Sequence, residues 1–129
     1  MKNYFSLFFI LITALIISSF TKSVNNRQIQ STSYEVPEDI NAIFDKSCIM
    51  CHNKDAKNEK SKGKLMLDGM AELTKSQQIS KLSKISKAVK KGEMPPEKFI
   101  AKYPEKALSD DDKKALVSWS KNYAKELAK

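Results

Sequence analysis

The segment Cys48-Ile49-Met50-Cys51-His52 constrains this 129-residue chain more than any other feature. It contains both cysteines and the only histidine of the sequence. The pattern C-x-x-C-H is typical of covalent haem attachment, in which each thiol forms a thioether with one haem vinyl group and the histidine reaches the iron. The sequence therefore predicts one covalently bound haem c, held by Cys48 and Cys51, with His52 as the proximal iron ligand. Because the chain has no second histidine, bis-histidine ligation and a second haem of this type are excluded.

Three other interpretations of the two cysteines remain open from the residues alone. A redox disulfide of the C-x-x-C kind usually lies where a strand meets a helix, and the flanking sequence has no strand pattern. A zinc site usually needs a second Cys/His pair downstream, and none follows His52. Unpaired structural cysteines are the third alternative. The lone histidine directly after Cys51 favours haem attachment over all three.

The first 35 residues differ in composition from the rest of the chain. Residues 1–23 carry Lys2 and an apolar run from Leu7 to Phe20, which is short for a membrane span of about 20 residues and typical of an export signal. The alternative is an uncleaved anchor that tethers the protein to the periplasmic face of a membrane. Residues 24–35 are polar and without apolar periodicity, so we expect a linker. The signal predicts export to the periplasm, which agrees with the haem motif because haem c is attached outside the cytoplasm.

Apolar residues at helical spacing predict three main helices in residues 36–129, a segment with the size of one small domain. The first helix is expected to begin at Pro37, a residue favoured at the first helical position. It should end near Ser47 and so present the cysteine motif at its C-terminal end. The second helix is expected from Lys75 to Lys91, with Gly92 as a stop signal.

The third helix is expected to open with Ser109 as its N-cap, followed by three aspartates in the first turn. We expect an exposed loop from Asn53 to Gly63, where the chain is polar, and an irregular connection from Lys98 to Ala107. The predicted fold class is all-α, with three main helices around one covalently attached haem.

The excess of positive charge bears on the class of partner. The chain has 23 Lys+Arg against 15 Asp+Glu, a formal net charge of +8, and the lysines are spread along its whole length. Such a surface favours acidic partners and speeds encounter with them, although a merely solvated lysine-rich face is an equal alternative. Nucleic-acid binding is not expected, because neither an arginine cluster nor an aromatic platform accompanies the lysines.

Three features together resemble the class I cytochromes c. They are a helix that ends in C-x-x-C-H, the later loop Gly92-Glu93-Met94-Pro95-Pro96, and a C-terminal helix with an aromatic residue, Trp119, on its inner face. The resemblance covers most of residues 36–129. It implies a small helical domain in which His52 is the proximal iron ligand and Met94 the distal one.

The choice of Met94 also has a physical argument beside the resemblance. A thioether is a neutral, soft ligand that favours reduced iron. Met50 is tied to the attachment segment, and Met66 and Met70 follow His52 so closely that they should stay on its side of the ring as core filler. Met94 has enough intervening chain to reach the other face of the haem.

The sequence departs from the class I pattern in two places. Ile40 occupies the position, eight residues before the first cysteine, where the family usually has a small residue that lets two helices cross closely. The proline that often follows the histidine is missing, so another carbonyl, expected in Gly63 to Leu67, must accept the second imidazole proton. By resemblance, Phe44 packs against Trp119 or Tyr123, and a haem propionate is one candidate partner for the indole N–H.

These features predict an exported monohaem cytochrome c that carries single electrons between redox proteins. Iron with two protein ligands has no open position for a substrate, so we do not expect an enzyme. One alternative is a haem-based sensor or small-ligand binder, in which Met94 is absent from the iron or easily displaced. Another is an accessory haem subunit, tethered through its N-terminal segment to a membrane oxidase or dehydrogenase.

Overall fold

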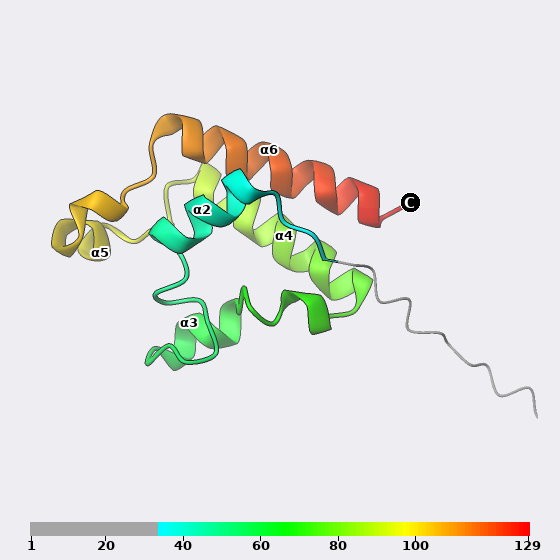
Figure 1. Cartoon of the computed structure of the whole chain (residues 1–129), viewed down its shortest axis with the longest axis horizontal. Coiled ribbons are helices and arrows are strands. Elements are labelled where there is room, and N and C mark those ends of the chain that lie inside the picture. Colours follow the sequence, from blue (N-terminus) through cyan, green and yellow to red (C-terminus); the bar gives the residue numbers. More distant parts are fainter. Residues whose placement is uncertain (1–33) are drawn as a thin grey trace, which may run out of the picture.

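The computed structural model describes residues 34–129. The predicted export signal, residues 1–23, and all but the end of the predicted linker lie outside the described residues. The described part contains α-helices and 3-10 turns and no strand, which confirms the all-α prediction (Figure 1). In chain order these elements are α2 (Glu38–Ser47), α3 (Glu59–Lys64), η2 (Met70–Glu72), α4 (Lys75–Lys90), α5 (Glu97–Lys102), η3 (Pro104–Lys106) and α6 (Asp110–Leu127).

Helices α4 and α6 form the largest helix–helix contact of the domain and lie side by side along much of their length (Figure 1). Each begins with a capping box, in which the N-cap side chain and the third helical side chain satisfy each other's backbone N–H groups. Thr74 and Gln77 form this box in α4, and Ser109 and Asp112 form it in α6. The predicted starts of both helices are therefore confirmed.

The C-terminal end of α4 is a Schellman motif built on one glycine. Gly92 has a φ of 70°, a left-handed conformation that L side chains rarely adopt. Its N–H donates to the Val89 carbonyl at 3.0 Å, and the Glu93 N–H donates to the Ala88 carbonyl at 2.9 Å. The helix therefore stops as the sequence predicts, and the chain turns directly into the segment that carries Met94.

Helix α2 crosses the α4–α6 pair and closes one end of the core (Figure 1). Its buried face carries Ile40, Ile43 and Phe44, which pack in one cluster with Ile85 of α4 and Leu116 of α6. Pro37 is the N-cap, so the helix begins one residue later than predicted. Ile40 is only 2% exposed and fills the helix contact where a smaller residue was expected by resemblance.

A second cluster fills the other end of the domain. Met70 and Leu82 are fully buried there against Leu127, so the prediction of Met70 as core filler is confirmed. The same prediction is wrong for Met66, which is 38% exposed. The short turn between Leu65 and Gly69 directs alternate apolar residues inward, and Met66 falls on the outer side.

Two short helices lie where irregular structure was predicted. Helix α3 begins inside the expected loop, with the Asn58 side chain accepting from the Ser61 N–H, and α5 begins directly after Pro96. Neither helix buries a residue, so neither has the apolar stripe from which a helix is predicted. In Figure 1 α5 lies at the end of the molecule farthest from the C-terminus.

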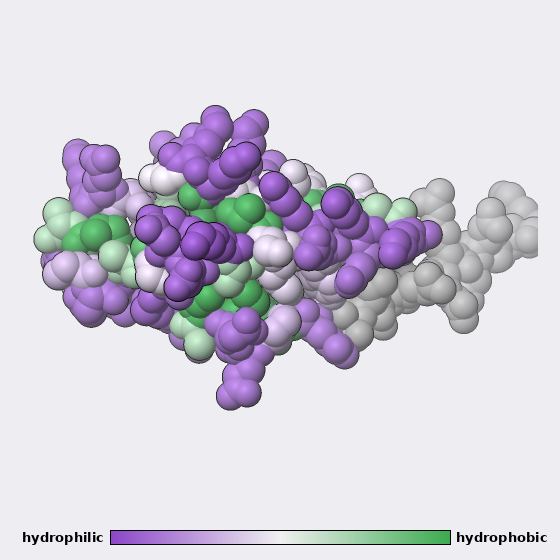
Figure 2. Space-filling view, turned by 90° about the horizontal axis from the view of Figure 1, so that it is seen from above, coloured by the Kyte–Doolittle hydropathy of each residue, from purple (hydrophilic) through white to green (hydrophobic). Residues whose placement is uncertain are grey.

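Hydrophilic residues cover most of the face seen in Figure 2, and hydrophobic residues show between them near its middle and at the α5 end. Within residues 34–129, none of the helices is both long and apolar enough to cross a membrane. The last residues before α2 contact α6, because the Glu35 N–H donates to the Tyr123 hydroxyl at 3.1 Å and Tyr34 packs against Trp119 and Tyr123.

Candidate haem site

The cysteine motif forms a tight turn that continues the C-terminal end of α2. Cys48 is the C-cap and its N–H donates to the Phe44 carbonyl at 2.8 Å. The N–H groups of Cys51 and His52 both donate to the Cys48 carbonyl at 3.1 Å. The turn therefore holds both thiols and the imidazole next to one another at the end of a helix whose other face is anchored in the core.

Cys48, Cys51, His52 and Met94 all line one pocket of about 850 Å³. This volume lies within the range of about 300–1,000 Å³ that is typical of cofactor sites. The structure therefore brings together all four of the residues that the sequence singled out, although Met94 is far from the cysteine motif in sequence. The apolar wall of the pocket consists of Phe44, Leu65, Ile85, Ala88, Val89, Pro95, Pro96, Phe99, Leu108 and Leu116.

The orientation of the His52 ring is fixed through its Nδ1 atom, which lies 3.1 Å from the Leu65 carbonyl oxygen. A carbonyl only accepts hydrogen bonds, so Nδ1 carries the proton and donates it. In the neutral ring, this tautomer leaves the Nε2 lone pair available to bind a metal ion. Leu65 lies within the range Gly63 to Leu67 in which the sequence predicts the acceptor, and that prediction is confirmed.

Among the methionines in residues 34–129, Met94 is the only one that lines this pocket; Met50, Met66 and Met70 do not. The Schellman motif at Gly92 and the extended Pro96 bracket the segment on either side. The peptide bond between Met94 and Pro95 is cis. The end of α4 and the start of α5 therefore fix the ends of the segment that carries Met94 into the wall of the pocket.

The aromatic residues behind the pocket form a connected cluster. The Phe44 ring, in the pocket wall, meets the Trp119 ring edge-to-face with centroids 5.7 Å apart. Trp119 in turn stacks on Tyr123 at 5.7 Å. The predicted packing of Phe44 against the last helix is confirmed, and it ties the cysteine-bearing end of α2 to α6.

Burial raises the pKa of the Cys48 thiol to about 11, with the neighbouring Cys51 as the smaller cause, so this sulfur is protonated at neutral pH.

The rim of the pocket is strongly basic. Among residues 34–129, only Glu93 contributes a carboxylate to the lining, and it pairs with Lys91 at 3.5 Å. A group that presents carboxylates at this rim is therefore favoured electrostatically. The lysines of the rim are Lys64, Lys81, Lys84, Lys87, Lys91 and Lys98.

The donors and the volume of the pocket fit a haem. Two thiols follow the C-x-x-C-H spacing, one imidazole has its Nδ1 atom bound to a carbonyl, one methionine lines the same hollow, and apolar side chains form much of the remaining wall. The zinc alternative has no comparable support, because within the described residues no three His, Cys, Asp or Glu side chains, Cys48, Cys51 and His52 included, are arranged so that they could hold a metal ion.

The sequence did not predict the part that α5 and its neighbours play in the site. Phe99 and Leu108 line the pocket, yet both lie in or beside the segment expected to be an irregular connection. The signal that could have found them is weak. They belong to two short apolar pieces of a lysine-rich stretch that follows the Met-Pro-Pro segment, and neither piece continues at a repeating spacing.

Comparison with known proteins supports the same cofactor. A search of the curated proteins and a search of the solved structures each found no match. The family of the haem-binding domain matches residues 7–122, which is most of the chain. The chain therefore belongs to the haem-binding domain family, and it is a haem-binding protein.

Proposed function

We propose that this protein is an exported, periplasmic monohaem cytochrome c, similar to class I cytochromes c, that carries single electrons between redox proteins and is not an enzyme. Cys48 and Cys51 hold the haem covalently, and His52 and Met94 bind its iron. The observation that carries the proposal is the shared pocket, in which two thiols, one correctly protonated imidazole and one thioether line the same apolar hollow.

Each residue has a distinct task in this proposal. The haem iron supplies a one-electron couple between its ferric and ferrous states. His52 donates its Nδ1 proton to the Leu65 carbonyl, which fixes the ring and raises the basicity of Nε2. Met94 would bind the iron through its neutral sulfur, which would favour the ferrous state and raise the potential. The apolar side chains of the wall would limit the access of water to the haem on the sides that they cover, so that these surroundings would reorganise little when the charge of the iron changes.

The electron-carrier proposal is tested by comparing Met94→Ala with a matched methionine. The control is Met66→Ala, because Met66 is 38% exposed and does not line the pocket. We expect Met94→Ala to lose the weak far-red absorption band of thioether-bound ferric haem. Its potential should fall, within the range of roughly 0.8 V over which axial ligands set haem potentials. Met66→Ala should keep both the band and the potential.

The same pair of variants separates the alternatives. If the wild-type protein lacks the thioether band and its ferrous form binds carbon monoxide readily, the axial position is open. The proposal of a simple electron carrier would then give way to a small-ligand binder. If the haem is released by acidified organic solvent, Cys48 and Cys51 are not its covalent attachment points.

A further inference from the structure

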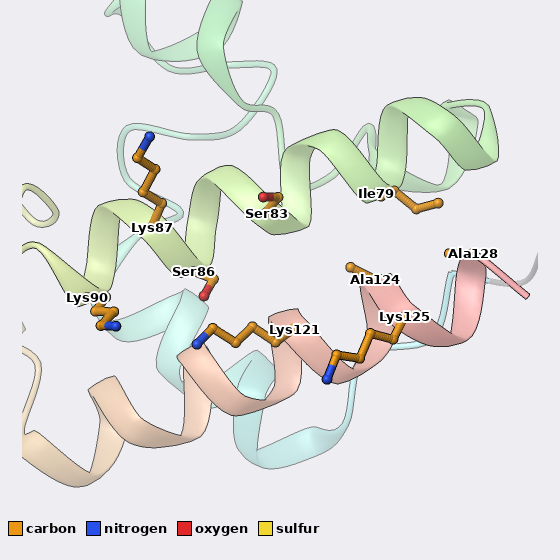
Figure 3. A pocket seen from close by; sticks show the side chains of 9 residues that line it. All are labelled: Ile79, Ser83, Ser86, Lys87, Lys90, Lys121, Ala124, Lys125 and Ala128. Carbon is orange, nitrogen blue, oxygen red and sulfur yellow. The ribbon is translucent and has the colours of Figure 1, made fainter.

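A second hollow, of about 520 Å³, lies between α4 and α6 (Figure 3). Its walls combine long basic side chains with small or apolar ones. Helix α4 contributes Ile79, two serines and two lysines. Helix α6 contributes Ala124 and two lysines, and Ala128 lies directly beyond its end. We call this hollow the α4–α6 groove, and its lining residues are Ile79, Ser83, Ser86, Lys87, Lys90, Lys121, Ala124, Lys125 and Ala128.

The charge of the groove is not compensated within the described part of the chain. All four of its lysines are exposed, and among residues 34–129 none of them forms an ion pair within 4.0 Å. The described residues that line the groove include no carboxylate. In Figure 3 the Lys121 side chain extends along α6 toward the end of α4 that carries Lys90. Like charges gathered around one hollow repel each other, so a negatively charged occupant relieves this repulsion.

The shape and lining of the groove indicate what kind of anion it accepts. A bilayer surface is flat and cannot enter a hollow between two helices, whereas a segment of polypeptide can. Ile79, Ala124 and Ala128 offer apolar contact between the charged side chains, so an occupant with apolar side chains as well as carboxylates is favoured over a free inorganic anion.

The groove also adjoins the haem pocket. Lys87 lines both hollows, so an occupant of the groove reaches the basic rim of the haem pocket. We propose that the α4–α6 groove docks an acidic, amphipathic segment of a partner protein, with carboxylates at Lys87, Lys90, Lys121 and Lys125 and small apolar side chains over Ile79 and Ala124. This binding does not depend on the proposed electron transfer, because the groove contains none of the four haem-binding residues.

The test measures binding of a short fluorescent peptide of Glu, Ala and Leu to the haem-loaded protein at an ionic strength of about 0.1 M, where the Debye length is about 10 Å. Lys121→Glu/Lys125→Glu should weaken binding by roughly tenfold or more, because two attractions become repulsions. The matched control is Lys57→Glu/Lys60→Glu, which changes net charge equally at two exposed lysines outside both hollows. It should change the affinity by no more than about twofold, as expected for distant charges screened by salt.

A third variant tests the hollow itself without a change of charge. Ser83 is exposed and lines the groove, so Ser83→Trp should fill it and weaken peptide binding while the circular dichroism and haem spectra stay unchanged. Four outcomes would overturn the proposal. They are absence of peptide binding, equal loss in both double variants, full binding by Ser83→Trp, and lysine-dependent binding of phosphatidylglycerol vesicles without binding of the peptide. Lysine-dependent self-association in sedimentation, again without peptide binding, would assign the groove to a second copy of the chain instead.

Discussion

His52 is held by two backbone groups that follow it closely in the chain. Its Nδ1 donates to the Leu65 carbonyl at 3.1 Å, and its own carbonyl accepts from the Leu67 N–H at 2.9 Å. Leu65 is the C-cap of α3, and its N–H donates to the Ser61 carbonyl at 3.0 Å. At the scale of single residues, the short helix α3 therefore serves as the spacer that sets the position of the acceptor for the imidazole.

This role of α3 predicts the effect of removing its N-cap. The Asn58 side chain accepts from the Ser61 N–H at 3.2 Å, and loss of such a cap costs about 1 kcal/mol. In Asn58→Ala the amides of Ser61 and Leu65 should exchange with solvent roughly fivefold faster, as that free energy implies for local opening. A looser Leu65 carbonyl weakens its hydrogen bond to His52, so the potential of the haem-loaded protein should rise.

Asn122→Ala provides the matched control, because Asn122 is an exposed residue of α6 with no side-chain hydrogen bond in the described structure. It should leave the exchange of Ser61 and Leu65 unchanged. Equal exchange rates at these two amides in wild type and Asn58→Ala would contradict a spacer role for α3.

At the scale of elements, the end of α2 is tied to the start of α6 by one ion pair. Lys46 Nζ lies 2.6 Å from an Asp112 carboxylate oxygen, and the two side chains are 37% and 20% exposed. The same Asp112 carboxylate accepts from the Ser109 N–H at 2.9 Å within the capping box. The residue thus joins the cysteine-bearing helix to the helix that carries Trp119.

The hydrogen bond from Lys46 holds the pKa of the Asp112 carboxyl below its usual value, with the bonds from Ser109 as smaller causes. A lowered folded-state pKa contributes stability that is present above the unfolded pKa of about 3.9 and is lost as the pH falls further. Asp112→Asn keeps an oxygen for the cap but removes the charge. It should lower the free energy of unfolding by about 0.5–1 kcal/mol at pH 6, and this difference should shrink below about pH 4. Urea unfolding across pH 3–6 measures both.

Asp111→Asn controls for loss of a charge in the same helical turn, since Asp111 is 94% exposed and pairs only with Lys114 at 3.3 Å. It should change stability less than Asp112→Asn at pH 6. A stability difference for Asp112→Asn that stays constant from pH 6 to pH 3 would show that the ion pair with Lys46 contributes nothing.

Whether an element could be predicted from the sequence depended on what its residues contact. Helices α2, α4 and α6 each bury an apolar stripe, and each follows an N-cap residue, which is Pro37, Thr74 or Ser109. Their type and position could therefore be predicted from the sequence. Helices α3 and α5 contain no fully buried residue, so they have no apolar stripe from which the sequence could predict them. Three residues of the haem site could be predicted because they are adjacent in the C-x-x-C-H motif. The lysines of the α4–α6 groove could not be predicted as a group, because they come together only when α4 packs against α6.

At the scale of the whole molecule, side chains from all of the described α-helices line the haem pocket. The core is divided into a cluster around Phe44 and Leu116 and a second cluster around Met70 and Leu82, and the pocket of about 850 Å³ lies against the first. A domain of this size has a small core to begin with. An apolar group that fills the pocket therefore contributes contacts that the side chains alone do not make.

Removal of the haem is therefore expected to affect the whole domain. The total stability of a small domain is about 5–15 kcal/mol. Residues of α2, α4 and the Met94 segment all line the pocket, so loss of a group bound there should remove a large share of this stability. Wild-type protein produced without haem attachment should keep part of its helical far-ultraviolet signal but lose the near-ultraviolet signal of Trp119 and unfold without a sharp transition. The haem-free variant Cys48→Ala/Cys51→Ala should behave in the same way, which excludes thiol oxidation as the cause. If the haem-free protein instead unfolds in a sharp urea transition, at the same midpoint as the haem-loaded form, the side chains alone determine the fold. Haem in the pocket would then contribute nothing to the stability of the domain.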